Sequence, residues 1–314
     1  MTPLAHQEDW TGEDVTVSEL ERQLAILRVA SEHDGVPDLR TSVLTHVAWV
    51  PPEWAEEAWS VLARLEERHP SRTIGLFPQD NGSRDAIDAD ASLHCFTIPG
   101  QENHVCSEVL ALRLHGRKVA VPASIVAPLL IPDLPAFLRW RGMPPWGAEP
   151  FPQLTDIVDR LIVDSTEWPD LPAAYGRLAE VFDRVAVSDI AWSRTSRWRR
   201  QLASLWPGIA DVRRIRVTAT PAQAHLLAGW LRSRLERPEI ELEIVPSDRL
   251  KGVDVDGEPT PFPPGEPPVP SDLLSDELDQ FGRDPIYEAA VRAAAAPSRR
   301  GGSSIEGHNA APTP

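Results

Sequence analysis

The sequence predicts an α/β protein: two α/β lobes with mixed, mainly parallel sheets, followed by a Pro-rich linker and C-terminal helices. Three observations support this prediction. Apolar runs typical of strands alternate with amphipathic segments between residues 41 and 245. The stretch "MPPWGAEPFPQ", residues 143–153, is dense in proline and glycine and divides this region into two blocks. Residues 259–270 contain seven prolines, and helical periodicity resumes after them.

The N-terminal segment, residues 1–35, is predicted to contain one helix at about 17–29. Ser18 and Glu21 have the spacing of a capping box, and the leucines that follow fall on one helical face. This apolar face needs a partner in the fold. We therefore expect the helix to pack against the first lobe.

The first lobe, residues 36–143, is predicted to begin with a β-α-β unit. The run "TSVLTHVAWV", residues 41–50, is rich in β-branched residues and typical of a strand. Pro51 and Pro52 end this strand and open a helix to about residue 69, after which "RTIGLF" is the next strand. A helical crossover between two such strands makes them parallel.

The rest of the first lobe adds a hairpin, a helix and a strand. Residues 91–98 and 105–116 are two strand-like runs, and the short connector 99–103 between them favours an antiparallel hairpin. A helix is expected at 122–130. A strand is expected at 135–140, with Pro135 at its first position.

The second lobe, residues 144–250, repeats the alternation of helices and strands. Its predicted elements are a helix at 153–160, a strand "LIVDS", helices at 172–185 and 196–206, a strand "RRIRVTA", a helix at 221–236 and a strand at 240–245. The last strand alternates apolar and acidic residues, which is typical of a sheet edge. The two blocks form either two lobes with separate sheets or one large continuous sheet.

The chain beyond residue 250 is predicted to be a tail attached to the two lobes. Residues 251–270 are expected to be an extended Pro-rich linker, because proline cannot donate to helix or sheet ladders. Residues 271–296 form a helical segment on this tether. Residues 297–314 are expected to be disordered.

Composition and charge exclude several classes of protein. The 314 residues are 42% hydrophobic and have a formal net charge of -16, which argues against general binding to nucleic acid or to an anionic membrane. No apolar run approaches the roughly 18 residues of a membrane span. The two cysteines, Cys95 and Cys106, exclude a disulfide framework and favour a reducing compartment. We therefore expect a cytoplasmic protein.

The sequence contains no short motif typical of catalysis, so no catalytic residue and no cofactor are predicted. The nearest approach to a metal site is the set His94, Cys95, His104 and Cys106. His94 and Cys95 would face opposite sides of a strand, so one tetrahedral site cannot easily use both. No metal is predicted, and the cysteines are expected to be half-buried strand residues.

Basic and aromatic residues gather in two places in this acidic chain. Residues 191–216 contain seven arginines and a single acid, and residues 139–141 read Arg-Trp-Arg at the end of a predicted strand. Arginine beside tryptophan suits an anion or an acidic protein surface. The candidate partner-binding residues are Arg139, Trp140, Arg141, Trp192, Arg194, Arg197, Trp198 and Arg199. The alternative is an amphipathic helix whose basic face is solvated and paired with acids elsewhere.

Two arginines are also candidates for binding a small anion. Arg139 ends one predicted strand, and Arg72 lies at the start of another in "HPSRTIGLF". The alternative for Arg72 is a turn that only begins the strand.

Several segments in one order closely resemble the OpcA family, the glucose-6-phosphate dehydrogenase assembly proteins. They include "RTSVLTHVAWV", "HPSRTIGLFP", "VCSEVLALRLHG", "PLLIPDLPAFLRWRG", "LIVDST", "DIAWSRTSRWR" and "LLAGWLRSRL". "LSDELDQFGRDPIYEAAV" resembles the tail of the same family. The bias toward Arg, Ala, Pro and Trp suits a high-GC actinobacterium.

The resemblance implies a non-catalytic protein that binds glucose-6-phosphate dehydrogenase and promotes its active oligomer as an assembly factor or allosteric activator. Such a protein would support the pentose phosphate pathway and NADPH metabolism. The alternative, from the fold class, is a sugar-phosphate-binding enzyme or sensor with its ligand crevice at strand C-terminal ends, where Arg139 and Arg72 would bind the phosphate. A third alternative is that the C-terminal helices alone recruit the partner.

Overall fold

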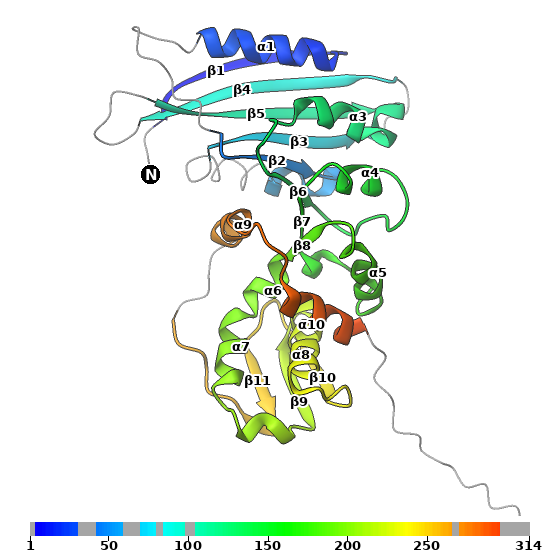
Figure 1. Cartoon of the computed structure of the whole chain (residues 1–314), viewed down its shortest axis with the longest axis vertical. Coiled ribbons are helices and arrows are strands. Elements are labelled where there is room, and N and C mark those ends of the chain that lie inside the picture. Colours follow the sequence, from blue (N-terminus) through cyan, green and yellow to red (C-terminus); the bar gives the residue numbers. More distant parts are fainter. Residues whose placement is uncertain are drawn as a thin grey trace, which may run out of the picture.

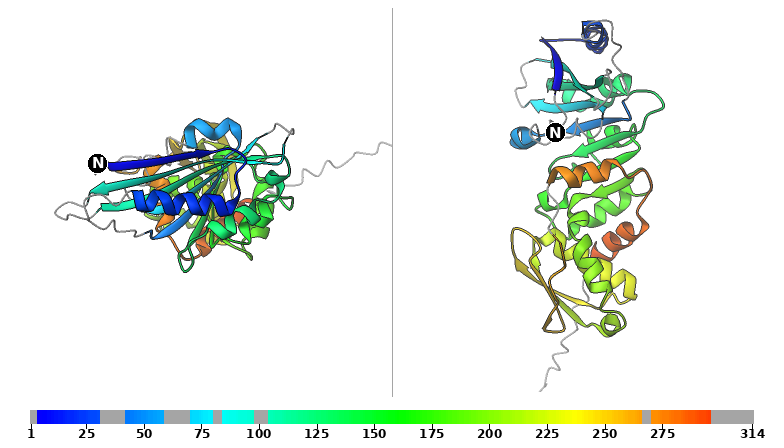
Figure 2. Two further views of the ribbon diagram at one scale, coloured as in Figure 1. Left: turned by 90° about the horizontal axis from the view of Figure 1, so that it is seen from above. Right: turned by 90° about the vertical axis from the view of Figure 1, so that its left-hand side faces the viewer.

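The structure, a computed structural model, describes residues 4–30, 42–58, 70–79, 84–97, 104–265 and 270–295. These residues form an elongated molecule with a large sheet toward one end and a small sheet toward the other (Figure 1). The C-terminal helices lie between the two sheets (Figure 2). Of the helix predicted from Pro51-Pro52 to about residue 69, residues 52–58 are helical. Residues 59–69 of that helix, the hairpin connector 99–103 and the tail 297–314 lie outside the described residues.

The large sheet has eight strands in the order β1-β4-β5-β3-β2-β6-β7-β8. The six strands from β5 to β8 in this order are parallel to their neighbours, whereas β4 is antiparallel to both β1 and β5. The predicted parallel β-α-β pair and the predicted hairpin are both confirmed. The strands are β1 Leu4–Gly12, β2 Leu44–Trp49, β3 Ser71–Gln79, β4 Ile87–Thr97, β5 His104–His115, β6 Ala136–Trp140, β7 Arg160–Val163 and β8 Ala186–Asp189.

The small sheet has four strands in the order β10-β9-β11-β12. The central strand, β9, pairs with β10 in parallel and with β11 in antiparallel orientation. The strand predicted at 240–245 is β10, and it lies at the edge as expected. The strands are β9 Arg214–Ala219, β10 Glu241–Pro246, β11 Gly252–Val255 and β12 Glu258–Pro259.

Helices connect many of the strands, and α6 and α8 have side-chain caps at their N-termini. The longest helix among the described residues, α8, begins after Thr220, whose hydroxyl accepts a hydrogen bond from the Gln223 amide, and ends before Glu236, which has the left-handed conformation. The α-helices are α1 Val17–Ala30, α3 Pro122–Val126, α4 Phe151–Thr155, α5 Ala173–Val181, α6 Ile190–Arg194, α7 Ser196–Ala203, α8 Pro221–Leu235, α9 Pro270–Leu278 and α10 Pro285–Ala295. Short 3-10 turns are η1 Pro52–Trp54, η2 Gly116–Ala120, η3 Ala127–Leu129, η4 Ser165–Glu167 and η5 Gly208–Asp211.

Alternating strand residues face two different cores, one on each side of the large sheet. Leu138 and Leu161 belong to the main core, together with buried residues of α1, α3, α4 and α5. Their neighbours Phe137 and Ile162 face the other side and pack against leucines of α9. A sheet covered on both faces explains why every residue of the central strand β2 is buried.

The boundary expected between residues 143 and 144 is wrong. Strands β7 and β8 belong to the large sheet, so the first sheet continues through the Pro/Gly-rich stretch to Asp189. The second sheet begins only with β9. The structure therefore combines the two alternatives. One extended sheet runs across the expected boundary and ends with β8, and a separate small sheet follows it.

The expected linker and tether are wrong in part. Residues 252–255 and 258–259 are strands β11 and β12 of the small sheet, not linker. The helical segment is not on a free tether either, because α10 packs against α5 and α8. This contact is close: a Cβ added at Gly229 of α8 would overlap the carbonyl oxygen of Ala290 in α10. The C-terminal helices are thus an integral part of the fold.

The two cysteines form a disulfide, which corrects the expectation of half-buried free thiols. Cys95 and Cys106 lie directly opposite each other in the β4–β5 register, with Cα atoms 4.0 Å apart, and both are buried. Directly opposite positions in an antiparallel pair are close enough for a disulfide. The bond removes both thiols as metal ligands, and it removes the support that free cysteines gave to a reducing compartment.

Candidate functional site

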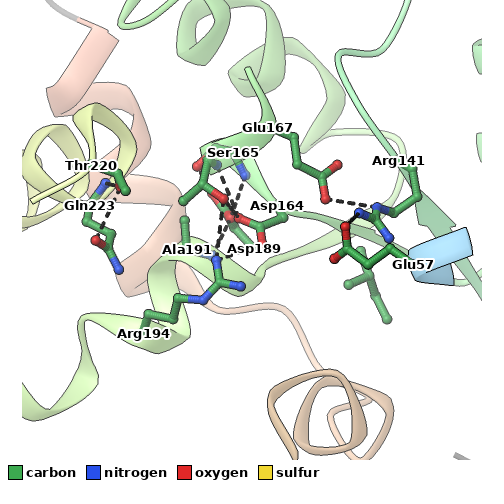
Figure 3. A network of polar contacts seen from close by, with 12 residues as sticks. Glu57, Arg141, Asp164, Ser165, Glu167, Asp189, Ala191, Arg194, Thr220 and Gln223 are labelled. Atoms are coloured by element: carbon green, nitrogen blue, oxygen red, sulfur yellow. Dashed lines mark hydrogen bonds and ion pairs between the residues drawn. The ribbon is translucent and has the colours of Figure 1, made fainter. Parts of the chain in front are cut away.

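Charged residues gather at the carboxyl ends of the parallel strands of the large sheet. Arg141 follows β6, Asp164 follows β7 and Asp189 ends β8, and the three lie along one edge (Figure 3). Open α/β sheets place their ligands at this edge. This edge is where a catalytic or binding site would be expected, so its contacts decide what it can do.

The Arg-Trp-Arg segment is buried and internally paired. Arg139 donates to Glu167 at 2.7 Å, and Arg141 lies 2.9 Å from the same carboxylate and 3.1 Å from Glu57. Trp140 is only 2% exposed and stacks on the ring of Trp49. The cavity beside these ion pairs has a volume of about 50 Å³, which is room for a few water molecules rather than a metabolite.

These contacts correct the expectations for residues 139–141. Both guanidinium groups already have carboxylate partners, so Arg139 is not available for a phosphate, and Trp140 is a core residue. Arg72 is also buried and paired. It lies in β3 and binds Glu108 at 2.7 Å, Glu21 at 3.2 Å and the Leu129 carbonyl. Neither arginine that was expected to bind an anion is free to do so.

Asp189 is the most deeply buried acid of this edge. It accepts hydrogen bonds from the amides of Ser165 and Ala191, from the Ser165 hydroxyl and from the phenol of Tyr287. Burial, and secondarily the charge of Asp164, raises the pKa of Asp189 to about 7. Asp164 is itself paired with Arg194 at 2.7 Å. Each of these polar groups therefore has a structural partner.

A larger hollow lies beside this edge, between α6 and α7 on one side and α9 and α10 on the other. Its volume is about 470 Å³, which is in the range of small-molecule sites. We call it the α7–α9 cleft. Its lining residues are Val187, Ser188, Asp189, Trp192, Ser193, Ser196, Arg197, Arg199, Arg200, Leu273, Asp276, Glu277, Gln280, Asp284 and Tyr287.

Arg199 is held in a fixed position on the wall of the cleft. Its guanidinium lies 3.4 Å from the centre of the Trp192 ring, and its Nε donates to the Thr195 hydroxyl at 3.0 Å. Burial lowers the pKa of Arg199 to about 10, so the side chain remains charged at neutral pH. Trp192 is buried and donates through Nε1 to Asp284. The tryptophan therefore supports the arginine and is not itself an exposed contact.

Arg197 binds the proline-rich segment that follows the small sheet. Its guanidinium donates to the carbonyl oxygens of Pro263, Pro264 and Gly265. Trp198, expected as a contact, is buried in the core of the small sheet, and its ring packs edge-on against Phe262. Phe262 is 66% exposed on its outer side, so this packing presents an aromatic ring to solvent.

The exposed aromatic residues near α7 were not among the sequence candidates. Arg197, Arg200 and Phe262 form what we call the basic–aromatic surface. Trp206, which follows α7 in the chain, is 63% exposed. A groove of about 270 Å³ lies on the basic–aromatic surface, bounded by Arg197, Arg200, Gln201, Ser204, Pro263 and Pro264. Trp206 ends the tryptophan-rich run 191–206 and precedes a proline, and this position at a helix end could have indicated an exposed side chain.

Neither a metal cluster nor a membrane span occurs within the described ranges. No group of three or more His, Cys, Asp or Glu side chains there is placed to hold a metal ion. No helix of those ranges is long and apolar enough to cross a membrane.

Comparison with known proteins places two family domains on the chain, both described by the words "Glucose-6-phosphate dehydrogenase subunit". Residues 63–180 match the N-terminal domain of that description. Residues 185–261 match its C-terminal domain. The first match lies within the large sheet and its helices. The second contains β8, α7, α8 and the whole small sheet.

Two curated cyanobacterial relatives have the name OxPP cycle protein OpcA. The protein of Synechococcus elongatus is 28% identical over 182 residues, which are 54% of this chain and 41% of the relative. The protein of Nostoc punctiforme is 30% identical over 181 residues, which are 54% of this chain and 38% of the relative. The aligned part thus spans less than half the length of either relative.

Proposed function

The chain belongs to the OpcA family, and we propose on this premise that it is a non-catalytic assembly factor for glucose-6-phosphate dehydrogenase. It would bind the dehydrogenase, promote its active oligomer and act as an allosteric activator, thereby supporting the oxidative pentose phosphate pathway. The observation that supports this proposal most strongly is the pair of consecutive family domains at 63–180 and 185–261, both described by the name of the dehydrogenase.

The state of the carboxyl edge supports a role without catalysis there. Where an open α/β enzyme would bind its substrate, Arg139 and Arg141 are paired with Glu167, and Arg141 also with Glu57. The small adjoining cavity leaves no space for a hexose. The charges at this edge are therefore better explained as internal supports of the fold than as reactive groups.

The basic–aromatic surface is the proposed docking site for the dehydrogenase. Phenylalanine and arginine are typical of the anchor residues that dominate protein interfaces. Phe262 is exposed, and Arg197 and Arg200 add positive charge to a chain with a net charge of -16. Docking through this surface should depend on salt, because positive charge would attract an acidic partner.

Kinetic measurement tests the proposed activation. We expect the purified chain alone to produce no NADPH from glucose 6-phosphate, and expect it to raise kcat/KM when added to the dehydrogenase. An unchanged kcat and KM at saturating amounts of the chain would contradict activation. Turnover by the chain alone would contradict the non-catalytic role.

A matched pair of phenylalanines tests the docking surface. Phe262 and Phe281 are 66% and 67% exposed, and each packs edge-on against one aromatic ring of the body. We expect Phe262→Ala to weaken binding of the dehydrogenase about tenfold or more and Phe281→Ala to leave it unchanged. Equal dissociation constants for the two variants, measured by titration calorimetry, would remove the basic–aromatic surface from the interface.

The alternative of a sugar-phosphate sensor is supported by one observation. Its expected cations, Arg72 and Arg139, are buried in ion pairs, but the α7–α9 cleft lies at the carboxyl end of β8 and has arginines of its own. The cleft and the docking surface share Arg197 and Arg200, whereas Arg199 and Glu277 line the cleft and do not belong to the docking surface.

A further inference from the structure

We propose that the α7–α9 cleft binds a small phosphorylated sugar, with the phosphate at Arg199 and Arg200 and the sugar hydroxyls at Glu277 and Ser193. This goes beyond the proposed assembly function, because the ligand would bind the chain alone. The inference depends on two walls of opposite character that face each other across one cavity.

The first wall is formed by arginines of α7 that have no salt bridge within the described residues. Elsewhere many arginines of this acidic chain form ion pairs, as Arg72, Arg139 and Arg194 do. Within the described parts of the chain, the three arginines of α7 at positions 197, 199 and 200 form no salt bridge. Arg199 is already held by Trp192 and Thr195, so little side-chain entropy remains to be lost when an anion binds.

The second wall is a buried carboxyl group. Glu277 of α9 is 2% exposed and accepts a hydrogen bond from the Ser193 hydroxyl. It forms no salt bridge with any arginine or lysine of the described ranges. Because burial removes water from the Glu277 carboxyl group, it raises the pKa of that group. A carboxyl in this position is suited to hydrogen bonds with ligand hydroxyls.

The other acids of the cleft accept hydrogen bonds elsewhere or are exposed, and none of them forms a salt bridge with an arginine of α7 within the described residues. Asp284 accepts from Trp192 and from the amides of Ile286 and Tyr287 at the start of α10. Asp189 accepts four hydrogen bonds, two from Ser165, one from Ala191 of α6 and one from Tyr287 of α10. Asp276 is exposed at the rim. The arginine wall therefore keeps its positive character.

The class of ligand follows from the two walls together. An inorganic anion would contact only the arginines, whereas an unphosphorylated sugar would contact only Glu277 and Ser193 and leave the positive charge of the arginines uncompensated. A sugar phosphate satisfies both, and a cleft of about 470 Å³ is large enough to hold one. The position at the carboxyl end of β8 is also the usual ligand edge of such sheets.

Titration calorimetry on the full chain, without the dehydrogenase, tests the proposal. The probes are glucose 6-phosphate, fructose 6-phosphate and ribose 5-phosphate, with glucose and inorganic phosphate as the two partial ligands. We expect at least one sugar phosphate to bind, inorganic phosphate to bind at least about tenfold more weakly, and glucose not to bind. Absence of binding by all three sugar phosphates at millimolar concentration would overturn the proposal. So would equal affinity for inorganic phosphate.

Variants assign the binding to this cleft. Arg199→Gln and Glu277→Gln should each weaken the sugar phosphate by about tenfold or more, whereas Arg216→Gln, on the exposed face of β9, should leave its affinity unchanged. Because Arg199 is partly buried, Arg200→Gln provides a second variant at an exposed position and should also weaken binding. Equal effects of Arg200→Gln and Arg216→Gln would place the anion elsewhere. A failure of the dehydrogenase to bind the chain would leave these results intact.

Discussion

Glu167 pairs with both arginines of the Arg-Trp-Arg segment, Arg139 and Arg141. Its carboxylate lies 2.7 Å from Arg139 and 2.9 Å from Arg141, and all three side chains are 7% exposed. Its other oxygen accepts from the Gly142 amide. An acid in this position fixes the chain direction after β6, so its charge should matter for stability and not for binding a partner.

Replacing this acid by its neutral amide tests the structural role. Glu167→Gln should lower the free energy of unfolding by roughly 3 kcal/mol, because two guanidinium groups remain buried with less compensation. The control is Glu241→Gln, which removes an exposed pair with Arg214 and should change stability by less than about 0.5 kcal/mol. Urea denaturation of both variants measures the difference, and equal losses would refute the buried network.

Asp189 should make the stability of the fold depend on pH. Its pKa is about 7 in the fold and 3.8 in the unfolded chain, so between these values the folded state binds the extra proton. Stability should therefore fall as pH rises from 5 to 7, by roughly 2 kcal/mol from this group. Asp189→Asn should flatten this part of the profile. Unfolding curves at several pH values test it, and an unchanged slope in the variant would contradict the assignment.

At the residue scale, the sequence identifies unusual side chains but not their burial. Arg139 and Trp140 were recognisable as unusual residues. Glu167, the carboxylate partner of Arg139, lies beside it only because β6 pairs with β7. Asp164 and Asp189 each end a strand-like run, a pattern that could have been recognised. Glu277 could not have been found, because its place depends on how α9 packs against β8 and α6.

At the scale of elements, long periodic segments were predictable and short or polar ones were not. α1, α8 and the β4–β5 hairpin agree with their sequence patterns. β8 has four residues, and β1 is a polar edge strand, so neither offers a clear apolar pattern. β12 escaped prediction because of Pro259. Proline is tolerated there because β12 is the edge strand of the small sheet.

Two helical glycines separate close packing from intrinsic helix propensity. Gly229→Ala should destabilise the protein by about 1–3 kcal/mol, because the new Cβ would overlap α10 at Ala290. Gly176→Ala, in α5, meets no atom within 4 Å and should be neutral or stabilise by up to about 1 kcal/mol. Thermal denaturation measures both. A harmless Gly229→Ala would mean that α10 is not packed against α8.

At the scale of the whole molecule, the C-terminal helices join the two sheets into one body. α9 covers the large sheet through Leu273, Leu274 and Leu278, and α10 packs between α5 and α8. The α7–α9 cleft and the basic–aromatic surface both lie around α7 and therefore next to this joint.

The central claim is that the chain acts by assembling another protein. Sedimentation velocity of glucose-6-phosphate dehydrogenase, titrated with the purified chain, measures this most directly. We expect the dehydrogenase to move to a larger, saturable species that contains both proteins, and the shift to weaken as salt is raised. Independent sedimentation of the two proteins at every ratio, with an unchanged dehydrogenase oligomer, would contradict the claim.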